Sequence, residues 1–427
     1  MFDAFPGRFL AHHPGYARVR PALSPLVLPQ DTADAVWAAT RDSLRVLTSV
    51  LRYRLRVAPE KTLEALGYSG TQATWLRSMH TPANLALASA FARADFVLGV
   101  EGPRLVEMNV GPTVGGLGIL DRYAEEFESV AADVTNCFGV RPPALLRPGR
   151  AWARCLLKIA GPRLGDRRRA RLALVVADDE VDVPHPHEAA RYLRREGIEA
   201  EVVKVNEIHL DGTATRTAHG PVDLVYGCFT FDQFSTVRYR RFVDAALAAE
   251  AAGGPRYLSP PLFTLLGNKA LLALATEGGD EAQSLPLLVA RTVIASGVAL
   301  DRAHEDRDRL VLKPAVGYGG KDVVIGRQCS PDLWSAALAR IVAEGRRHVL
   351  QEYVAPSPVD FSSDRGPASY EIGLGCLCLG GRLGGFLVRH VPTGSTGPIN
   401  VSRGATFSGA CVLPKAELAR WRPEKRL

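Results

Sequence analysis

The spacing of apolar and polar positions changes twice along the chain, and each change predicts a different architecture. From residue 31 to residue 92 apolar side chains recur every three to four positions, which predicts helices that each bury one face. The segment 95–110 instead alternates apolar and polar residues on both sides of a Glu-Gly-Pro sequence. This alternation predicts a β-hairpin directly after the helical region.

Short apolar runs alternate with helical patterns between residues 150 and 260. Strands are predicted at 171–177, 198–203 and 223–226, and helices at 186–195 and 239–251. Because strands that alternate with helices at this spacing usually pair in parallel, we expect a small parallel α/β domain. The region contains no Gly-x-Gly-x-x-Gly sequence, so a dinucleotide site is not indicated.

Strand patterns and glycine turns predominate from residue 262 to residue 411. A chain of 427 residues exceeds what one hydrophobic core usually supports, so subdomains are expected. The predicted fold class is mixed, α+β with an α/β part. The expected division is N-terminal helices plus the hairpin in 1–149, the small α/β domain in 150–260, and a region with a glycine-rich loop in 261–427.

Composition narrows the class of protein. Apolar residues make up 47% and charged residues 23% of the chain, as in soluble globular proteins. No run of 18 apolar residues exists, so we expect no membrane span, and the N-terminus lacks the pattern of a signal peptide. A cytoplasmic location is the expectation. The seven cysteines form no Cys-x-x-Cys pair, which favours core-filling thiols over disulfides or a zinc site.

The formal net charge of +7 does not indicate nucleic-acid binding, because its source is diffuse. The arginines are spread along the chain among acidic residues, and only eight of the 52 basic residues are lysines. The one dense run, 163–171, leads into a predicted strand and is interpreted as a solvated loop. No basic motif interleaved with aromatic residues accompanies it, so no nucleic-acid partner is expected.

The second strand of the predicted hairpin has two chemically different faces. Side chains alternate along a strand, so Glu107 and Asn109 point to one side, and Val106, Met108 and Val110 point to the other. The apolar set is expected to face the core. The polar set places a carboxylate and an amide side by side.

The length of the hairpin turn decides whether Asp95 joins this polar face. A three-residue turn pairs Asp95 with Asn109 and puts both on the face of Glu107, whereas a two-residue turn sends Asp95 to the other side. Three oxygen donors on one face suit magnesium, a hard cation that keeps sites for phosphate and water. An exposed polar strand face is the alternative at this point.

Other polar residues in the last third of the chain suit an anionic ligand. A loop with Gly317, Gly319 and Gly320 is able to turn backbone N–H groups toward phosphate oxygens, although a surface turn is the alternative. Lys313 lies in an otherwise apolar strand and requires an anionic partner. Arg389 ends an apolar strand, and its alternative is an ordinary surface position.

The spacing Arg-x-Asp, Glu-x-Asn and Pro-Thr resembles the magnesium-binding segment of glutathionylspermidine synthetase domains. The matching residues are Arg93, Asp95, Glu107, Asn109, Pro112 and Thr113. This resemblance implies a circularly permuted ATP-grasp fold with an inserted small parallel domain, in which Asp95, Glu107 and Asn109 bind the metal and precede the lysines that bind ATP.

Further motifs follow in the order of that family. Gly267-Asn268-Lys269 resembles the helix start whose lysine contacts ATP, and the strand with Lys313 resembles that of the second ATP lysine. The resemblance also implies a phosphate-covering loop and a hinge strand that receives adenine and ribose. The nucleotide contacts it implies in those two segments are Gly317, Tyr318, Gly319, Gly320, Lys321, Gln351, Glu352, Tyr353 and Val354.

The implied activity is that of an ATP-dependent carboxylate–amine ligase, which forms an amide or peptide bond through an acyl phosphate and releases ADP and phosphate. Arg93 and Arg389 would be its catalytic residues, ATP and Mg²⁺ its cofactors, and a small carboxylic acid and an amine its substrates. The resemblance also allows a homodimer. The residues after Arg389 are not acidic as in the family, so glutathione and spermidine are not assumed. The alternatives are a small-molecule kinase and a catalytically decayed ATP-binding module.

Overall fold

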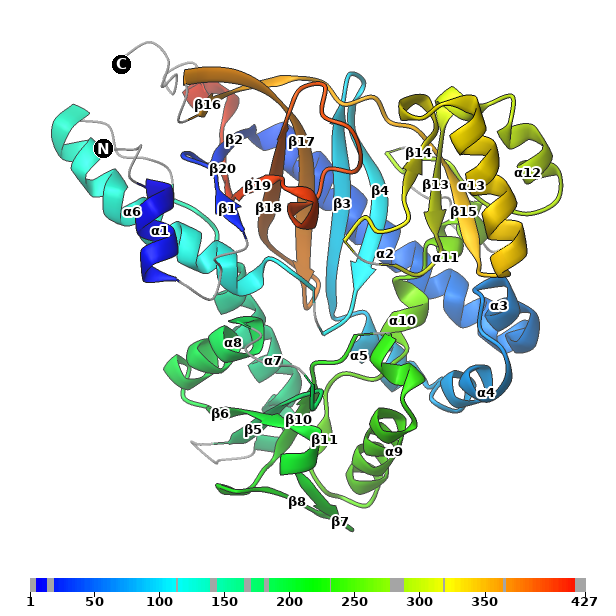
Figure 1. Ribbon diagram of the computed structural model, residues 1–427. Helices are drawn as coiled ribbons and strands as arrows, with labels where there is room; N and C mark the ends of the chain where they lie inside the picture. The colour runs from blue at the N-terminus through cyan, green and yellow to red at the C-terminus, as the bar shows by residue number, and fades with distance from the viewer. Residues whose placement is uncertain are drawn as a thin grey trace.

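The chain folds into a central β-sheet with helices on both sides, a small α/β unit below it and a strand-rich unit beside it (Figure 1). This arrangement confirms the predicted mixed α and β class. The computed structural model describes residues 5–13, 19–112, 114–138, 144–164, 170–179, 184–230, 232–276, 288–317, 319–363 and 366–418.

Helices fill the N-terminal part, as predicted for 31–92. They are α1 (Phe5–His12), α2 (Gln30–Val57), α3 (Pro59–Ala65), α4 (Gly70–Ser78) and α5 (Pro82–Ala88). Proline at the first position of α3 and of α5 divides the region, because proline starts a helix well but does not continue one. The long helix α2 buries a stripe of apolar residues against the central sheet.

The central sheet has seven strands drawn from both ends of the chain. Its order is β1 (Arg20–Pro21), β19 (Thr406–Ser408), β18 (Arg382–Pro392), β17 (Gly366–Leu379), β3 (Phe91–Gly99) and β4 (Gly102–Val110), with β16 (Val359–Ser363) on β17. A second N-terminal strand, β2 (Leu26–Pro29), pairs in parallel with β20 (Ala410–Leu413). The predicted hairpin is β3–β4, and its neighbour β17 comes from more than 250 residues later in the sequence.

The α/β unit contains the parallel sheet that the sequence predicts. Its strand order is β11 (Arg256–Tyr257), β10 (Leu224–Gly227), β5 (Arg171–Val176) and β6 (Glu199–Lys204), and every pairing is parallel. The accompanying helices are α6 (Leu117–Phe138), α7 (Pro148–Leu164), α8 (Pro184–Arg195) and α9 (Val237–Ala251). An antiparallel sheet that was not predicted lies beside it, with strands β7 (His209–Asp211), β8 (Ala214–Thr217) and β9 (Gly220–Pro221).

The strand-rich unit holds a four-stranded antiparallel sheet of order β12 (Thr292–Ile294), β15 (His348–Glu352), β13 (Leu310–Pro314) and β14 (Val324–Ile325). Its helices are α11 (Lys269–Thr276), α12 (Val298–Ala303) and α13 (Pro331–Glu344). The short helix α10 (Phe263–Leu266) packs against β4 and α2, and α14 (Lys415–Leu418) follows β20 near the C-terminus. Short 3₁₀ helices connect some elements: η3 (Val205–Glu207), η4 (Asp232–Ser235), η5 (Arg307–Arg309), η6 (Gly326–Gln328) and η7 (Val401–Arg403).

The apolar core explains how these parts hold together. One cluster runs from α2 through the adjacent face of the central sheet to α10 and α11, and a second joins α6, α7 and α8 to β5. A small separate cluster around Trp334 and Leu338 packs α13 onto the four-stranded sheet. The buried cysteines Cys376 and Cys378 belong to the first cluster as free thiols. No helix in the described part of the chain is long and apolar enough to cross a bilayer.

Candidate functional site

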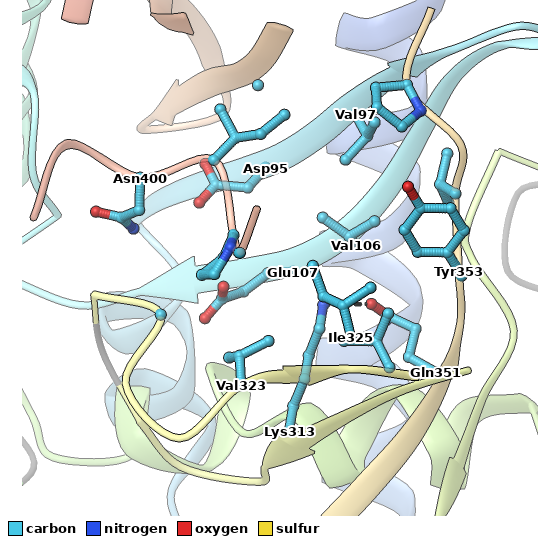
Figure 2. Close-up of a pocket in the computed structure, with 18 of the residues that line it drawn as sticks. Asp95, Val97, Val106, Glu107, Lys313, Val323, Ile325, Gln351, Tyr353 and Asn400 are labelled. Carbon is cyan, nitrogen blue, oxygen red and sulfur yellow. Dashed lines mark hydrogen bonds between the residues drawn. The ribbon is translucent and has the colours of Figure 1, made fainter. Parts of the chain in front are cut away.

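A cavity lies between the central sheet and the four-stranded sheet, on the face of β17 opposite α2 (Figure 2). The hairpin β3–β4 forms one wall, and β13, β14 and the end of β15 form the other. Figure 2 shows Asp95 and Glu107 on the hairpin side, Lys313 and Gln351 opposite them, and Asn400 entering from a third direction. Residues far apart in the sequence therefore meet around one cavity.

Asp95 lies beside Glu107 in the hairpin, but the length of the turn alone does not predict this position. Gly99 pairs with Gly102, so the turn has two residues, which would have sent Asp95 to the other face. A β-bulge follows, because the pairing shifts by one residue between Asp95 and Phe96. The bulge restores the shared face, and Asp95 pairs directly with Glu107.

The same bulge corrects the expectation for Val106. This residue was expected to face the core with Met108 and Val110, but it has no partner in the strand pairing and lines the cavity instead. Met108 is buried in the core as expected, and Val110 is half-buried against it. Val106 thus adds an apolar side chain to the cavity next to Glu107.

Asp95 is held in a buried network of charges. Arg93 donates from Nε to Oδ1 at 2.7 Å and from Nη2 to Oδ2 at 3.0 Å, and Arg389 Nη2 lies 2.8 Å from Oδ1. Although burial opposes its charge, Arg389 and Arg93 lower the pKa of Asp95 to about 2. This carboxylate therefore stabilises the fold above about pH 4, and its contribution is lost as the pH falls through about 2.

Two glycines in β17 make room for this network. Gly373 pairs with Arg389 on one neighbouring strand, and Gly375 pairs with Asp95 on the other, so the Asp95–Arg389 ion pair crosses over β17. A Cβ atom on Gly375 would lie 2.8 Å from Arg93 Cδ and 3.0 Å from Asp95 Oδ1. Glycine in the interior of a strand often marks such a close approach.

Arg389 keeps a donor available for a bound anion. The residue is 6% exposed, and its Nε has no hydrogen-bond partner among the described residues. A buried donor without a partner is costly, so this atom is suited to an anionic ligand in the cavity.

Lys269 reaches Glu107 from the start of α11. Its Nζ lies 2.7 Å from Glu107 Oε1 and 3.4 Å from the carbonyl oxygen of Gly317. The backbone N–H of Lys269 donates to Ala315, which ties the helix start to the glycine-rich loop. The structure therefore brings the first predicted lysine into direct contact with a predicted metal ligand.

Lys313 lies on the opposite wall and donates from Nζ to Gln351 Oε1 at 2.5 Å (Figure 2). The Gln351 amide is oriented in turn by its bond to Thr292 Oγ1. Burial, with a smaller contribution from Lys269, lowers the pKa of Lys313 to about 8, and Glu107 opposes this shift. Lys313 is thus a half-buried ammonium that loses its proton around pH 8.

The glycine-rich loop spans the gap between β13 and β14. Gly319 and Gly320 have φ values of 67° and 70°, which glycine adopts without strain. Gly317, Gly320 and Lys321 line the cavity. Two further predicted residues, Tyr318 and Thr113, lie outside the described part of the chain.

The predicted hinge residues line the far end of the cavity with Gln351. Glu352 accepts from Arg104 Nη2 at 3.1 Å and from the backbone of Arg291 at 3.2 Å, so its carboxylate is already engaged. Tyr353 and Val354 also face the cavity. Val97 and Ile325 lie on the same side of the cavity as Tyr353 and Gln351 (Figure 2), and their apolar surface suits a flat ring.

Sequence reasoning missed several lining residues. Glu371 faces the cavity two positions before Gly373 on β17, and Asn400 enters it from the segment after β18. The alternation of Glu371 with Gly373 and Gly375 was the available pattern, because small residues in a strand indicate a close approach. Asn400 had no comparable pattern, since it lies outside regular structure.

Two predicted residues lie behind the cavity and do not line it. Arg93 uses Nη1 to donate to the carbonyl of Gly115 at 2.9 Å, and Asn109 Nδ2 donates to Asp95 Oδ2 at 2.9 Å. Both residues hold Asp95 in place. Arg389, by contrast, does line the cavity.

The cavity offers the kind of oxygen ligands that a magnesium ion prefers. Among the described residues no group of three or more His, Cys, Asp and Glu side chains is arranged to hold a metal. Two carboxylates of the predicted set, Asp95 and Glu107, line the cavity, and oxygen donors of this kind suit a cation that keeps water and phosphate ligands. Asp95 and Glu107 are paired with cations here, so a bound cation would have to share or replace these partners.

The charges around these carboxylates favour a polyanionic ligand. Arg93, Arg389, Lys269 and Lys313 surround two acids, Asp95 and Glu107, so positive charge is in excess at this end. Val97 and Ile325 lie toward Tyr353, away from Asp95 (Figure 2). A molecule with a flat ring and a phosphate chain matches both halves.

No protein-family model matches the chain, and no curated protein matches its sequence. Among solved structures it is similar to a glutathione synthetase-like effector from Globodera pallida in its apo form, with a TM-score of 0.58, 14% identity, and coverage of 92% of this chain and 90% of that one. This likeness establishes a shared fold alone.

Two other matches have TM-scores too low to inform the fold. A protein described as a gamma-glutamylcysteine synthetase from Methylobacillus flagellatus is 12% identical over 85% of both chains, with a TM-score of 0.43. D-cycloserine synthetase is 24% identical over 43% of this chain and 59% of that one, with a TM-score of 0.28.

Proposed function

We propose that this protein is an ATP-dependent ligase that joins a carboxylic acid to an amine. The observation that carries the proposal is the single cavity in which Asp95 and Glu107 of the hairpin face Lys269 and Lys313. Two carboxylates and two lysines in a cavity that also has apolar walls suit a nucleoside triphosphate with its cation. The glutathione synthetase-like fold is consistent with this chemistry.

The finer part of the proposal is membership in the glutathionylspermidine synthetase-like branch of ATP-grasp ligases. It rests on the order of the motifs, in which Asp95, Glu107 and Asn109 precede Lys269 and Lys313 along the chain. This order corresponds to a circularly permuted ATP-grasp fold. The α/β unit of residues 150–260 is then the inserted domain next to the substrates.

The proposed reaction has two balanced steps. An oxygen of the substrate carboxylate attacks the γ-phosphorus of ATP, the bond to the β-phosphate oxygen breaks, and ADP leaves. The amine nitrogen then attacks the carbonyl carbon of the acyl phosphate, loses a proton and displaces inorganic phosphate. No covalent protein nucleophile is required, and no cysteine or serine is assigned to the chemistry.

Each residue of the cavity has a defined task in this proposal. Lys269 and Lys313 position the phosphates, and the free Nε donor of Arg389 binds the attacking carboxylate or the oxyanion that forms on it. Magnesium, held by Asp95 and Glu107, would neutralise phosphate charge when bound, and Asn109 orients Asp95 from behind. Arg93 keeps Asp95 ionised and oriented. The glycine-rich loop excludes water that would hydrolyse the acyl phosphate.

The test measures ADP and free phosphate over a matrix of acids and amines. We expect ADP release that requires both an acid and an amine, with one free phosphate for each ADP. Glu107→Gln should lower this rate by about 100-fold or more, because it removes a carboxylate from the phosphate end of the cavity.

The control is Glu101→Gln, which neutralises a glutamate in the exposed turn of the same hairpin and should leave the rate unchanged. Phosphate transferred to a stable product without an amine would favour the kinase alternative. Equal rates for wild type and Glu107→Gln would remove the magnesium assignment.

A further inference from the structure

A second cavity lies over the tip of the β17–β18 hairpin, away from the proposed nucleotide site. Helix α2 forms one of its walls and α7 the other, and the turn at Gly380-Gly381 lies between them. Its volume is about 950 Å³, and no residue lines both cavities. Gly375, which pairs with Asp95, is five residues from Gly380, or about 16 Å along the strand. We call this cavity the basic groove.

The charged residues that line the basic groove all have the same sign. Asp and Glu are absent from its lining in the described part of the chain. The cations are Arg41, Arg45, Arg52, Arg154, Lys158 and Arg382.

Helical spacing explains why these cations converge. Arg41, Arg45 and Arg52 are separated by four and seven residues, so α2 presents them on one side. Arg154 and Lys158 are four residues apart and occupy one side of α7. The groove therefore has a basic stripe on each wall.

Neighbouring acids offset only part of this charge. Asp42 pairs with Arg41 and Arg45, and Glu196 pairs with Arg154. The remaining three cations make no ion pair with any described residue. They are Arg52, Lys158 and Arg382.

The floor of the groove is apolar and contains no aromatic ring among its described residues. The apolar side chains of the lining include Leu44, Ile159, Leu379 and Leu383. Single-stranded nucleic acids usually bind where bases stack on aromatic side chains next to basic residues. The floor instead suits aliphatic side chains, so the groove matches a ligand with both carboxylates and apolar groups.

We propose that the basic groove binds an acidic peptide segment of a partner protein, with aliphatic residues that occupy the floor. Acidic side chains on both edges of such a segment pair with the stripes of α2 and α7, and Arg52, Lys158 and Arg382 gain the partners they lack within the chain. Arginine clusters are known to recognise acidic motifs, and grooves are known to bind amphipathic segments.

The exposure of these cations determines the kind of binding expected. All six are exposed at the rim, so they attract an acidic partner over a distance and set its orientation. Such contacts weaken as salt screens them. The affinity should therefore fall steeply with ionic strength. The binding that persists at high salt should come from contacts with the apolar floor.

The test uses a fluorescent peptide of about 16 residues in which pairs of glutamates alternate with pairs of leucines. At helical spacing, this pattern puts the leucines on one face and the glutamates beside them. Its matched control carries lysine at each glutamate. We expect the acidic peptide alone to bind, and its affinity to fall by about tenfold or more between about 50 and about 300 mM salt. Replacing Arg52, Lys158 and Arg382 together with glutamate should weaken binding by about tenfold or more.

A second triple variant separates the groove from net charge. Arg216, Arg241 and Arg302 are exposed, line neither cavity, and give the same change in charge when replaced with glutamate. This variant should bind the acidic peptide like the wild type. Both triple variants should keep the thermal midpoint and the ADP release of the wild type.

Three outcomes would overturn the proposal. One is binding of the acidic peptide no tighter than that of the lysine peptide. Another is an equal loss of affinity in both triple variants. The third is tighter binding of a single-stranded RNA or of anionic lipid vesicles that depends on Arg52, Lys158 and Arg382, which would assign the groove to that other partner.

Discussion

Lys313 illustrates how burial and function oppose each other at a single residue. Its ammonium group lies in a strand with apolar neighbours, and its direct hydrogen-bond partner is the neutral amide of Gln351. Its pKa of about 8 means that a modest rise in pH removes the charge that would bind phosphate. A bound anion would raise this pKa again, because opposite charges stabilise the ammonium form.

ATP affinity should therefore depend on pH through Lys313. The ammonium is charged below about pH 8 and neutral above it, so the ATP dissociation constant should rise by about tenfold between about pH 7 and about pH 9. Titration calorimetry in buffers of different ionisation enthalpy should show proton uptake on binding near pH 8.

Lys313→Arg is the control, because a guanidinium stays charged over this range. Its dissociation constant should stay flat between the two pH values even if its affinity is lower. A flat wild-type profile, or the same slope in the arginine variant, would contradict the assignment.

Asp95 and Glu107, the two predicted carboxylate ligands, differ in how much stability the fold would lose if each were replaced. Asp95 is buried with two arginines, whereas Glu107 is partly exposed and contacts one lysine. Removing a buried ionic partner leaves uncompensated charge and typically costs about 3–5 kcal/mol. Glu107 is therefore the better position at which to test function without disturbing the fold.

Strand β17 is the element on which the site depends most. It separates the strand of Asp95 from the strand of Arg389, and the ion pair crosses it where Gly373 and Gly375 have no side chains. The bulge in β3–β4 then turns Glu107 and Val106 to the same cavity. Backbone irregularity and missing side chains are both required for the observed geometry.

Gly375→Ala should disrupt this element. The added methyl group would lie within 3.0 Å of both Arg93 and Asp95, so the charged network has to shift. We expect a loss of about 1–3 kcal/mol in the free energy of unfolding, measured in urea, together with a large loss of ADP release.

Gly7→Ala is the matched control for that substitution. Gly7 is exposed in α1, and an added Cβ there meets no atom outside its own helix within 4 Å, so alanine should leave stability unchanged or raise it by up to about 1 kcal/mol. If Gly375→Ala proved as stable and active as Gly7→Ala, the crossing of the ion pair over β17 would not need glycine.

At the scale of the whole molecule, the two ends of the chain form one structure. Strand β1 pairs with β19, and β2 pairs with β20, so residues 20–29 complete sheets that contain residues 406–413. Contacts of such sequence separation are slow to form, because the loop-closure entropy is lost before they contribute. The N-terminal segment is therefore part of the folded unit that carries the cavity.

Leu28→Ala tests this long-range connection. Leu28 is 2% exposed and packs in the core that joins α2 to the central sheet, so its truncation should cost about 2–5 kcal/mol of unfolding free energy. Val27→Ala, at the half-buried neighbouring position of the same strand, should cost clearly less. Urea unfolding monitored by fluorescence distinguishes the two, and equal costs would contradict the assigned strand orientation.

The sequence alone determined the types of most elements and indicated most of the charged residues that line the cavity. Helical periodicity located α2 to α5, alternation located the β3–β4 hairpin, and short apolar runs located three strands of the parallel sheet. A lysine in an apolar strand and glycines in a loop indicated an anion site without any coordinates. These features are local, since each depends on residues within one turn or one strand.

Only the tertiary structure decided which of these residues meet. The bulge that restores Asp95 to the face of Glu107 comes from strand pairing, which turn length did not reveal. Glu371, Asn400 and the two walls of the basic groove come together through contacts between segments far apart in the chain. Periodicity can be detected within a single segment of the sequence. Strand register and packing depend instead on how all segments of the chain pack together in one core.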